Sequence, residues 1–524
     1  MNNLPVVDIV IIFIYLGAMV MIGFYFSRRN KNTEQFTSAS GKIPGWAIGL
    51  SIYATFLSSN TFLGVPGKAF GGNWNAFVFS LSMPLAAWIA SRYFVPFYRS
   101  TGEISAYTHL EKRFGPWART YAVICFLLTQ FARMGSIFFG MALSLQALTG
   151  FSMASIMIVM GVCIIIYTVM GGMEAVIWTE VVQGIIKTLG ALLILGIIIN
   201  QMPGGMSAIW DIATRDHKIS LGSLSPDLTE STFWVILFYG FFINLNNFGM
   251  DQNYIQRYHT AKSSKQASRS VWLCVWMYVP ASLLFFIIGT ALYAFYQVNP
   301  AMIEPVKMQV VAEQESLTSE TVNYLTTHLK PADYGDKVLP FFMVTKIPTG
   351  LVGLIVSAIL SAAMSTISSN MNSSATVFTM DIYKRYVNRS ISDRRQLFIL
   401  KLFTIVFGLI GLFTGLAMIG SRSLLDVWWE LSGIFAGGML GLFLLGLISK
   451  RTSSPEAFTA VLIGIVIILW MTLGDLLPAR YAFLRSPLHK NMIIVLGTLS
   501  IFLSGLLITR IRNKNIKYKE ARDI

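Results

Sequence analysis

Charged residues are scarce in this chain: they make up 12% of its 524 residues, whereas 54% are apolar. A soluble domain carries about 25% charged residues, so a soluble fold of this size could not cover its surface. The apolar residues come in long blocks, such as 9–26 and 402–419, each long enough to cross a bilayer as a helix. The composition therefore predicts an all-α polytopic membrane protein.

Cysteine and histidine are also sparse. The three cysteines, Cys125, Cys163 and Cys274, fall in apolar blocks without disulfide or zinc-binding spacing. The five histidines are scattered in loops and at span ends, and the spans contain no HExxH, no GxSxG and no paired His and Asp. These absences argue against a His/Cys metal site and against a membrane-embedded enzyme. They leave an ion channel open as an alternative of a different class.

The net charge of +15 would suit a nucleic-acid binder, but the basic residues lie in short loops between apolar blocks. The long loop 298–338 is net acidic, and only the outer loop near Arg480 and Arg485 departs mildly from the alternation. Cytoplasmic loops of membrane proteins carry an excess of Lys and Arg. We therefore expect a lipid-embedded protein with its N-terminus outside and its C-terminus in the cytoplasm, and no nucleic-acid partner.

The first apolar block lacks a basic leader and a small-residue cleavage site, so we interpret it as an uncleaved helix. Thirteen spans are expected in all. They are placed at 6–27, 44–70, 74–98, 118–149, 152–172, 175–201, 232–257, 270–297, 339–383, 397–419, 424–449, 455–475 and 490–510.

The second span is unusually polar. It carries five Ser or Thr residues, Asn60 and a Gly-Pro break within otherwise apolar sequence. A helix that only anchors the protein in lipid needs none of these. The segment is therefore a candidate broken helix, whose freed backbone carbonyls can bind a cation.

The segment 361–373 reads SAAMSTISSNMNS and forms a polar stripe. Residues spaced by three and four share one face of a helix. Hydroxyls and free carbonyls suit Na⁺, whereas a divalent ion would call for carboxylates or imidazoles. The stripe would equally suit close helix packing, but together with the broken span it favours ion binding. The residues on this face are Ala362, Ser365, Ser368, Ser369 and Asn372, with Thr366 beside them.

Arg133 lies near the middle of the span 118–149. A charge at the bilayer centre costs at least about 2.5–3.5 kcal/mol, so it should face a cavity and meet an anion. One interpretation is that its guanidinium fork holds a substrate carboxylate. The alternative is a structural ion pair with Asp251 or Glu430.

Further charged and polar residues fall within or at the ends of spans. Glu180 begins a span, where it is either part of a second cation site or an interfacial acid favoured by the helix dipole. Lys187, two turns further along, is expected to pair with an acid or to snorkel to the interface. Asp251 and Tyr254 lie in a polar run and are candidates for an inner vestibule and gate, or for a cap and an interfacial aromatic.

Several rare patterns occur together and in order along the chain. They are AAMSTISSNMNSSATVFTMDIYKR (362–385), AVIWTEVVQG (175–184), DQNYIQRY (251–258) and SGIFAGGMLGLFLLGLISK (432–450). In these stretches the chain resembles the sodium:solute symporter family, which includes bacterial sialic acid, galactose and proline transporters.

The resemblance implies a leucine-transporter-like fold. A leading helix (6–43) would precede two inverted five-helix repeats (44–201 and 232–449), and additional helices (455–510) would follow. Such a protein is expected to be a monomer in a bacterial plasma membrane.

The resemblance also implies sites for one or two sodium ions. The main site would use carbonyls of Ala54, Leu57 and Ala362 and hydroxyls of Ser365 and Thr366. In family members with two sodium ions, the residues of the second site match Ser365, Ser368, Ser369 and Glu180 of this chain. Those members usually carry Asp where this chain has Glu180.

An Arg at position 133 resembles the sialic acid transporters of the family, where it holds the carboxylate. Ser58 and Thr61 match polar substrate contacts there, while Phe56 stands where a hydroxyl would be expected. Asn60 and Ser80 complete the expected substrate residues. The resemblance thus implies sodium-coupled import of a carboxylated sugar such as sialic acid by alternating access, with a neutral sugar or a monocarboxylate as the alternative.

Overall fold

The computed structural model describes residues 5–28, 32–312, 325–326, 328–419, 424–474 and 479–522. Within these ranges the chain is helical, with a single β-bridge between Ile43 and Ala261. Some of the charges used to orient the chain lie outside the described residues. They are Arg29, Lys31, Glu313, Glu315 and Glu320.

Ten helices of the described chain are long and apolar enough to cross a membrane, and the bent pair α3 (Gly45–Phe56) and α4 (Ser59–Gly71) makes an eleventh span. Helix α10 (Met153–Gln201) has 49 residues and is kinked at Gly172, where φ is 57°. A helix of that length would measure roughly 70 Å, about twice a bilayer core. Counting α10 as two spans, and adding the apolar α20 (Leu424–Ile448), gives the expected thirteen.

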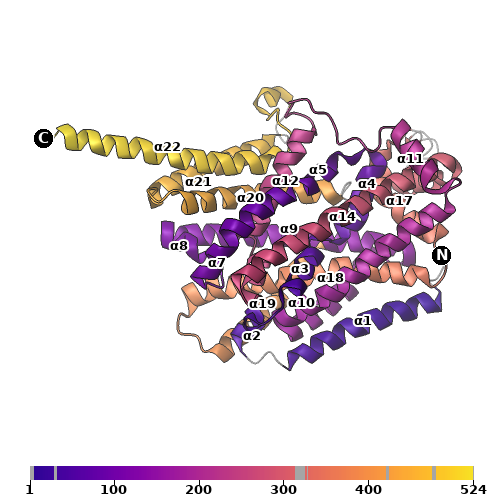
Figure 1. Ribbon diagram of the computed structural model, residues 1–524, viewed down its shortest axis with the longest axis horizontal. Coiled ribbons are helices and arrows are strands. Elements are labelled where there is room, and N and C mark those ends of the chain that lie inside the picture. The colour runs from indigo at the N-terminus through magenta and orange to yellow at the C-terminus, as the bar shows by residue number, and fades with distance from the viewer. Residues whose placement is uncertain are drawn as a thin grey trace.

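Figure 1 shows the other long elements. Those that begin and end near the expected boundaries are α1 (Val6–Ser27), α9 (Pro116–Thr149), α14 (Ser264–Val298), α19 (Asp393–Ala417) and α21 (Ser454–Leu473). Helix α12 (Phe233–Met250) ends before its expected boundary, and α22 (Met492–Arg522) continues beyond its own. The third expected span is divided into short pieces, η2 (Trp74–Phe77), α5 (Val78–Leu81), α6 (Met83–Ile89), η3 (Ala90–Phe94) and α7 (Val95–Thr101).

Two spans are broken inside the bundle. The axis bends by 55° between α3 and α4, where Leu57 and Ser58 leave helical geometry. The prediction of one uninterrupted span over 232–257 is wrong, because Asp251 separates α12 from α13 (Gln252–Thr260). Its side chain accepts a hydrogen bond from the backbone N–H of Asn253 and so caps α13. Each break falls in the first helix of an expected five-helix repeat.

The single span expected at 339–383 is also divided. Helix α17 (Pro331–Lys346) ends first, and α18 (Leu351–Val377) begins after Gly350, whose φ of 89° suits glycine and strains other residues. Helix α18 then continues into the π-helix η5 (Phe378–Val387). The apolar run in the sequence hides this division because both pieces are apolar.

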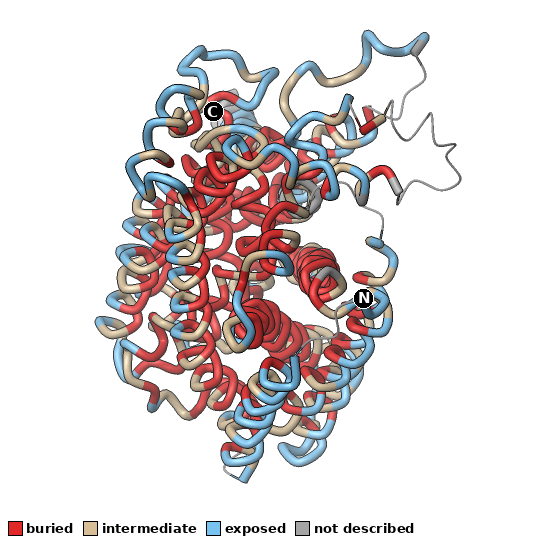
Figure 2. The backbone as a smooth tube through the Cα atoms, turned by 90° about the vertical axis from the view of Figure 1, so that its right-hand side faces the viewer, coloured by how far each residue is buried: buried red, intermediate tan, exposed pale blue. Residues whose placement is uncertain are grey.

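Helix α18 lies at the centre of the molecule, with 89% of its most apolar window buried, whereas α1 lies at the edge with 22%. Figure 2 shows buried residues gathered inside and exposed residues around the outside. Exposed large apolar side chains include Phe13, Trp276 and Phe413, as expected for helices that face lipid. Helices α20, α21 and α22 pack together at one end (Figure 1).

Candidate substrate cavity and cation sites

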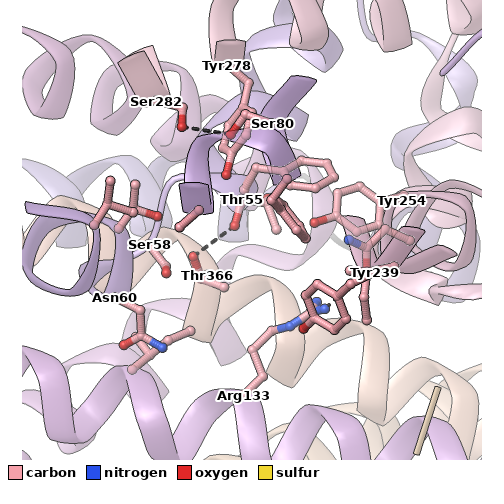
Figure 3. Close-up of a pocket in the computed structure, with 18 of the residues that line it drawn as sticks. Thr55, Ser58, Asn60, Ser80, Arg133, Tyr239, Tyr254, Tyr278, Ser282 and Thr366 are labelled. Carbon is pink, nitrogen blue, oxygen red and sulfur yellow. Dashed lines mark hydrogen bonds between the residues drawn. The ribbon is translucent and has the colours of Figure 1, made fainter. Parts of the chain in front are cut away.

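A cavity of about 790 Å³, a volume that includes solvent at its mouth, lies beside the α3/α4 break. Its walls come from α3, α4, η2, α5, α9, α12, α13, α14 and α18, so both broken helices contribute. Figure 3 shows polar side chains pointing into it from several elements. All six expected substrate residues line it: Phe56, Ser58, Asn60, Thr61, Ser80 and Arg133.

The first turn of α4 opens onto this cavity. Ser58, Asn60 and Thr61 all line it there. Asn60 donates from Nδ2 to Ser136 Oγ at 2.9 Å, while its buried Oδ1 accepts no hydrogen bond from the described residues. The N-terminus of a helix carries partial positive charge and attracts anions. This end of the cavity therefore suits a polar ligand with an anionic group.

Arg133 reaches the cavity from α9 and is buried, with 8% of its surface exposed. Its Nη1 lies 2.8 Å from Asp251 Oδ2, and its Nη2 lies 3.3 Å from Asn247 Oδ1. Glu430, the other acid considered as a partner, instead pairs with Lys490 at 3.1 Å. The structure thus gives Arg133 both an ion pair with Asp251 and a place in the cavity wall.

Aromatic rings cover one side of the cavity. The ring of Phe56 lies 4.8 Å from that of Tyr254 and 5.4 Å from that of Tyr278, measured between centroids. Phe248 packs against Phe56 from the other side at 5.6 Å. Such rings pack against the apolar face of a sugar and shut out water. Tyr254 belongs to α13 directly after the second break, so a movement of that short helix would move this wall.

The structure brings three of the expected main-site ligands together around the ammonium group of Lys187. Nζ of Lys187 donates to the carbonyl oxygens of Ala54 at 2.6 Å and Leu57 at 2.8 Å, and to Ser365 Oγ at 2.9 Å. The expectation that Lys187 pairs with an acid or snorkels is therefore wrong. In this arrangement the ammonium group of Lys187 is surrounded by oxygens that were expected to bind sodium.

The other two expected ligands lie next to this cluster. Thr366 Oγ1 is 3.1 Å from the carbonyl oxygen of Thr55 and 3.3 Å from that of Ala362. Ser365 Oγ is 3.1 Å from the carbonyl oxygen of Ala54. These contacts join α18 to the end of α3, where the helix breaks.

The expected second site contains an arginine. Nη2 of Arg257 lies 2.8 Å and 2.7 Å from the two carboxylate oxygens of Glu180, and 2.6 Å from Ser369 Oγ. Ser51 and Thr55 complete the cluster by hydrogen-bonding both charged groups. Of the expected ligands, only Ser369 and Glu180 meet here.

Ser368 and Ser365 do not contact Glu180. Ser368 Oγ donates to the carbonyl oxygen of Ser365 at 3.2 Å, and Ser365 belongs to the Lys187 cluster. Arg257 ends the expected span 232–257, and the sequence predicts it among the basic residues at the cytoplasmic side; the structure instead buries it, with 1% of its side chain exposed. The sequence did contain one indication that Lys187 lies near the expected cation sites. It follows Glu180 by seven residues, so the two side chains lie on the same side of α10.

A family model described as the sodium:solute symporter family matches residues 36–464. The sodium/sialic acid symporter NanT of Aliivibrio fischeri is 31% identical over 92% of this chain and 93% of its own length. The sodium/sialic acid symporter SiaT of Proteus mirabilis is 32% identical over 96% and 95%. More distant relatives are the sodium/glucose cotransporter of Vibrio parahaemolyticus (25% over 95% and 91%) and human sodium-coupled monocarboxylate transporter 1 (28% over 91% and 76%).

The solved structure of a Na⁺-coupled sialic acid symporter, in a substrate-bound outward-open state, is 30% identical to this chain with a TM-score of 0.83. The match covers 96% of this chain and 98% of that one. Mhp1, a nucleobase-cation-symport-1 transporter, shares the fold alone, with 14% identity, a TM-score of 0.54, and 92% and 95% coverage.

A multi-pass bundle with two broken helices and a polar cavity beside the breaks, similar to these solved structures, is a secondary transporter of the leucine-transporter-like fold. It is a membrane transport protein and not an enzyme. The chain belongs to the sodium:solute symporter family.

Proposed function

We propose that this protein is a secondary active symporter that imports a carboxylated small solute by alternating access, with a sialic acid as the first candidate. It would span a bacterial plasma membrane as a monomer, with its N-terminus outside and its C-terminus in the cytoplasm. The relatives NanT and SiaT are sodium/sialic acid symporters, which supports this class of substrate.

The observation that carries the proposal is the position of Arg133 in the wall of the cavity that the first turn of α4 also lines (Figure 3). A guanidinium group binds a carboxylate through charge-assisted hydrogen bonds in a planar fork. The N-terminus of α4 adds a second positive feature to the same cavity. The aromatic rings around Phe56 then suit the apolar face of a ring-shaped solute.

Asp251 provides the counter-ion for Arg133 at the cavity wall. A substrate carboxylate would compete with Asp251 for the guanidinium. Because Asp251 also caps α13, this competition couples the arrival of the solute to the position of that helix and of Tyr254. Coupling of this kind depends on a difference in affinity between the two states of the transporter.

The relatives NanT and SiaT are sodium symporters, so sodium is the first coupling ion to test. The main-site oxygens and the Glu180 cluster are the proposed cation sites. Each contains a cationic side chain of the protein itself, so an entering ion would compete with that side chain for the same oxygens.

A thermal-shift screen of the purified protein tests the proposal. A sialic acid should raise the melting temperature of the wild-type protein, whereas hexoses and monocarboxylates should not. Replacing Arg133 should remove the shift. Stabilisation by glucose that survives the replacement of Arg133 would refute the carboxylated substrate.

A neutral sugar is the second candidate, because Asp251 already balances the charge of Arg133 and Phe56 replaces an expected hydroxyl. A monocarboxylate would share the Arg133 contact but leave most of the cavity unfilled. The same screen separates these three classes of solute.

A further inference from the structure

Lys187 is fully buried in the middle of the bundle and has no carboxylate bonded to its ammonium among the residues that the structure describes. Buried lysines are normally paired with an acid. The acid on the same face of α10, Glu180, is held by Arg257. The charge of Lys187 is instead balanced by oxygen dipoles, which is how a protein balances a bound metal ion.

The three hydrogens of the ammonium group match three oxygens. Two are backbone carbonyls at the α3/α4 break, those of Ala54 and Leu57, and the third is Ser365 Oγ on α18. An ammonium group has three donors, so its hydrogen-bonding capacity is filled. The lysine thus joins α10 to the broken helix and to α18 at the point where the oxygens of the main cation site converge.

Two monovalent cations cannot share these oxygens. A sodium ion placed among them would lie within a few ångströms of Nζ, in a buried site where water does not screen the repulsion. We propose that the ammonium of Lys187 is a built-in cation that holds the main site, and that sodium enters the site only after this side chain has left. The proposal holds whichever solute the cavity takes.

The cluster around Glu180 also contains a cationic side chain of the protein, that of Arg257. Arg257 meets Glu180, Ser369, Ser51 and Thr55, and so covers the carboxylate on which a second cation would depend. With both cationic side chains in place, α3, α10, α13 and α18 are held together without an added ion. The assembly of the solute cavity is therefore less dependent on sodium in this protein than it would be without Lys187.

Binding of ²²Na⁺ to the purified full-length protein tests this proposal directly. The variants are Lys187→Ala and Lys187→Ser, which remove the ammonium and leave space at the oxygens. The matched control is Lys218→Ala. Lys218 also donates to two backbone carbonyls, those of Phe70 and Gly72, but lies outside the cation sites.

We expect each Lys187 variant to bind sodium at least about tenfold more tightly than the wild-type protein, and the Lys218 variant to match the wild type. Adding Ser365→Ala to Lys187→Ala should remove the gain, which would place the ion at this site. Equal sodium affinity with and without Lys187 would overturn the proposal. Failure of both the wild-type protein and the Lys187 variants to bind sodium would also overturn the proposal.

If both Lys187 variants fail to fold, Lys187→Met takes their place, because it keeps most of the side-chain volume and removes the charge. This variant should also bind sodium more tightly than the wild-type protein, and adding Ser365→Ala should weaken its binding at least about tenfold. Equal sodium affinity in Lys187→Met and the wild-type protein would overturn the proposal. None of these outcomes depends on solute transport, so they are independent of the proposed substrate.

Discussion

Two oppositely charged side chains, Arg133 and Asp251, meet at the wall of the cavity, and the proposed function makes their pairing a determinant of which solutes bind. Arg133 and Asp251 lie 2.8 Å apart and both are almost fully buried. A buried pair of this kind adds little stability by itself, but removal of one partner leaves an uncompensated charge. The effect of a substitution on binding must therefore be separated from its effect on folding.

Replacing Arg133 by Ala is expected to lower the affinity for a carboxylated solute about tenfold to a hundredfold, because one or two charge-assisted hydrogen bonds are lost. The measurement is ligand binding by calorimetry on the purified protein. The matched control is the double variant Arg133→Ala with Asp251→Asn, which removes both charges. The control should fold like the wild type and still bind poorly, and tight binding by it would exclude Arg133 as the carboxylate ligand.

The sequence predicted residues that line the cavity, while the arrangement of the expected cation ligands was predicted only in part. Polar residues in an apolar span stand out, which is why Ser58, Asn60 and Arg133 could be predicted from the sequence. The positions of Lys187 and Arg257 could not be, because a basic residue of a span is normally expected to pair with an acid or to reach the interface. Only three-dimensional packing shows that both point inward.

At the scale of helices, the buried Glu180–Arg257 pair ties α10 to α13. Arg257→Gln should destabilise the protein by about 3–5 kcal/mol, because it leaves the carboxylate of Glu180 buried without its partner. The double variant Glu180→Gln with Arg257→Gln should recover most of that loss. Thermal unfolding of the wild type, Glu180→Gln, Arg257→Gln and the double variant measures the coupling, and additive losses would show that the two side chains act independently.

Close packing of α10 against α18 depends on Gly190. A Cβ atom added there would lie 2.4 Å from the Cβ of Ala358, so Gly190→Ala should cost about 1–3 kcal/mol of stability through overpacking. Gly196→Ala on the same helix is the matched control. Its added Cβ would meet nothing within 4 Å, and alanine favours the helix. Equal melting temperatures for the two variants would contradict the close approach of α10 and α18.

An ionic cluster joins α8 (Thr108–Phe114) to α9 and η5. Glu111 lies 2.7 Å from both Arg119 and Arg385. Burial alone would raise the pKa of Glu111, but hydrogen bonds and charge from these two arginines lower it below its usual value. A carboxylate with a lowered pKa stabilises the folded state above its unfolded pKa, near 4.5, and the benefit is lost as the pH falls through the folded value.

The melting temperature of the wild-type protein should therefore fall as the pH drops from about 5 to about 3. Glu111→Gln should be less stable at neutral pH and show a shallower fall. If the melting temperature of Glu111→Gln depended on pH in the same way as that of the wild type, this contribution of Glu111 would be ruled out.

The element boundaries show where sequence patterns fail. Both breaks lie beside the cavity, but only the α3/α4 break is surrounded by several hydroxyls in the sequence; the Gly-Pro element expected to break this span lies inside α4, where Gly64 and Pro66 keep helical geometry. The break at Asp251 depends on a single capping aspartate, and the division before α18 depends on Gly350. Neither interrupts the apolar pattern enough to be predicted.

For the whole molecule, apolar content, loop charges and four motifs were sufficient to predict a helical transporter of the sodium:solute symporter family. The centre of the bundle holds what the sequence could not show: two cationic side chains at the sites where the family resemblance placed sodium. The solute cavity and the cation sites share the break in the second span. Binding at one is therefore expected to affect the other.

Uptake of a radiolabelled sialic acid by the reconstituted protein in liposomes tests the central claim most directly. With an inward sodium gradient, wild-type proteoliposomes should accumulate the label saturably above protein-free liposomes. Unlabelled sialic acid should compete, glucose should not, and the double variant Arg133→Ala with Asp251→Asn should transport none. Absence of sialic acid uptake by a preparation that saturably transports glucose, with the double variant equally active, would contradict the account.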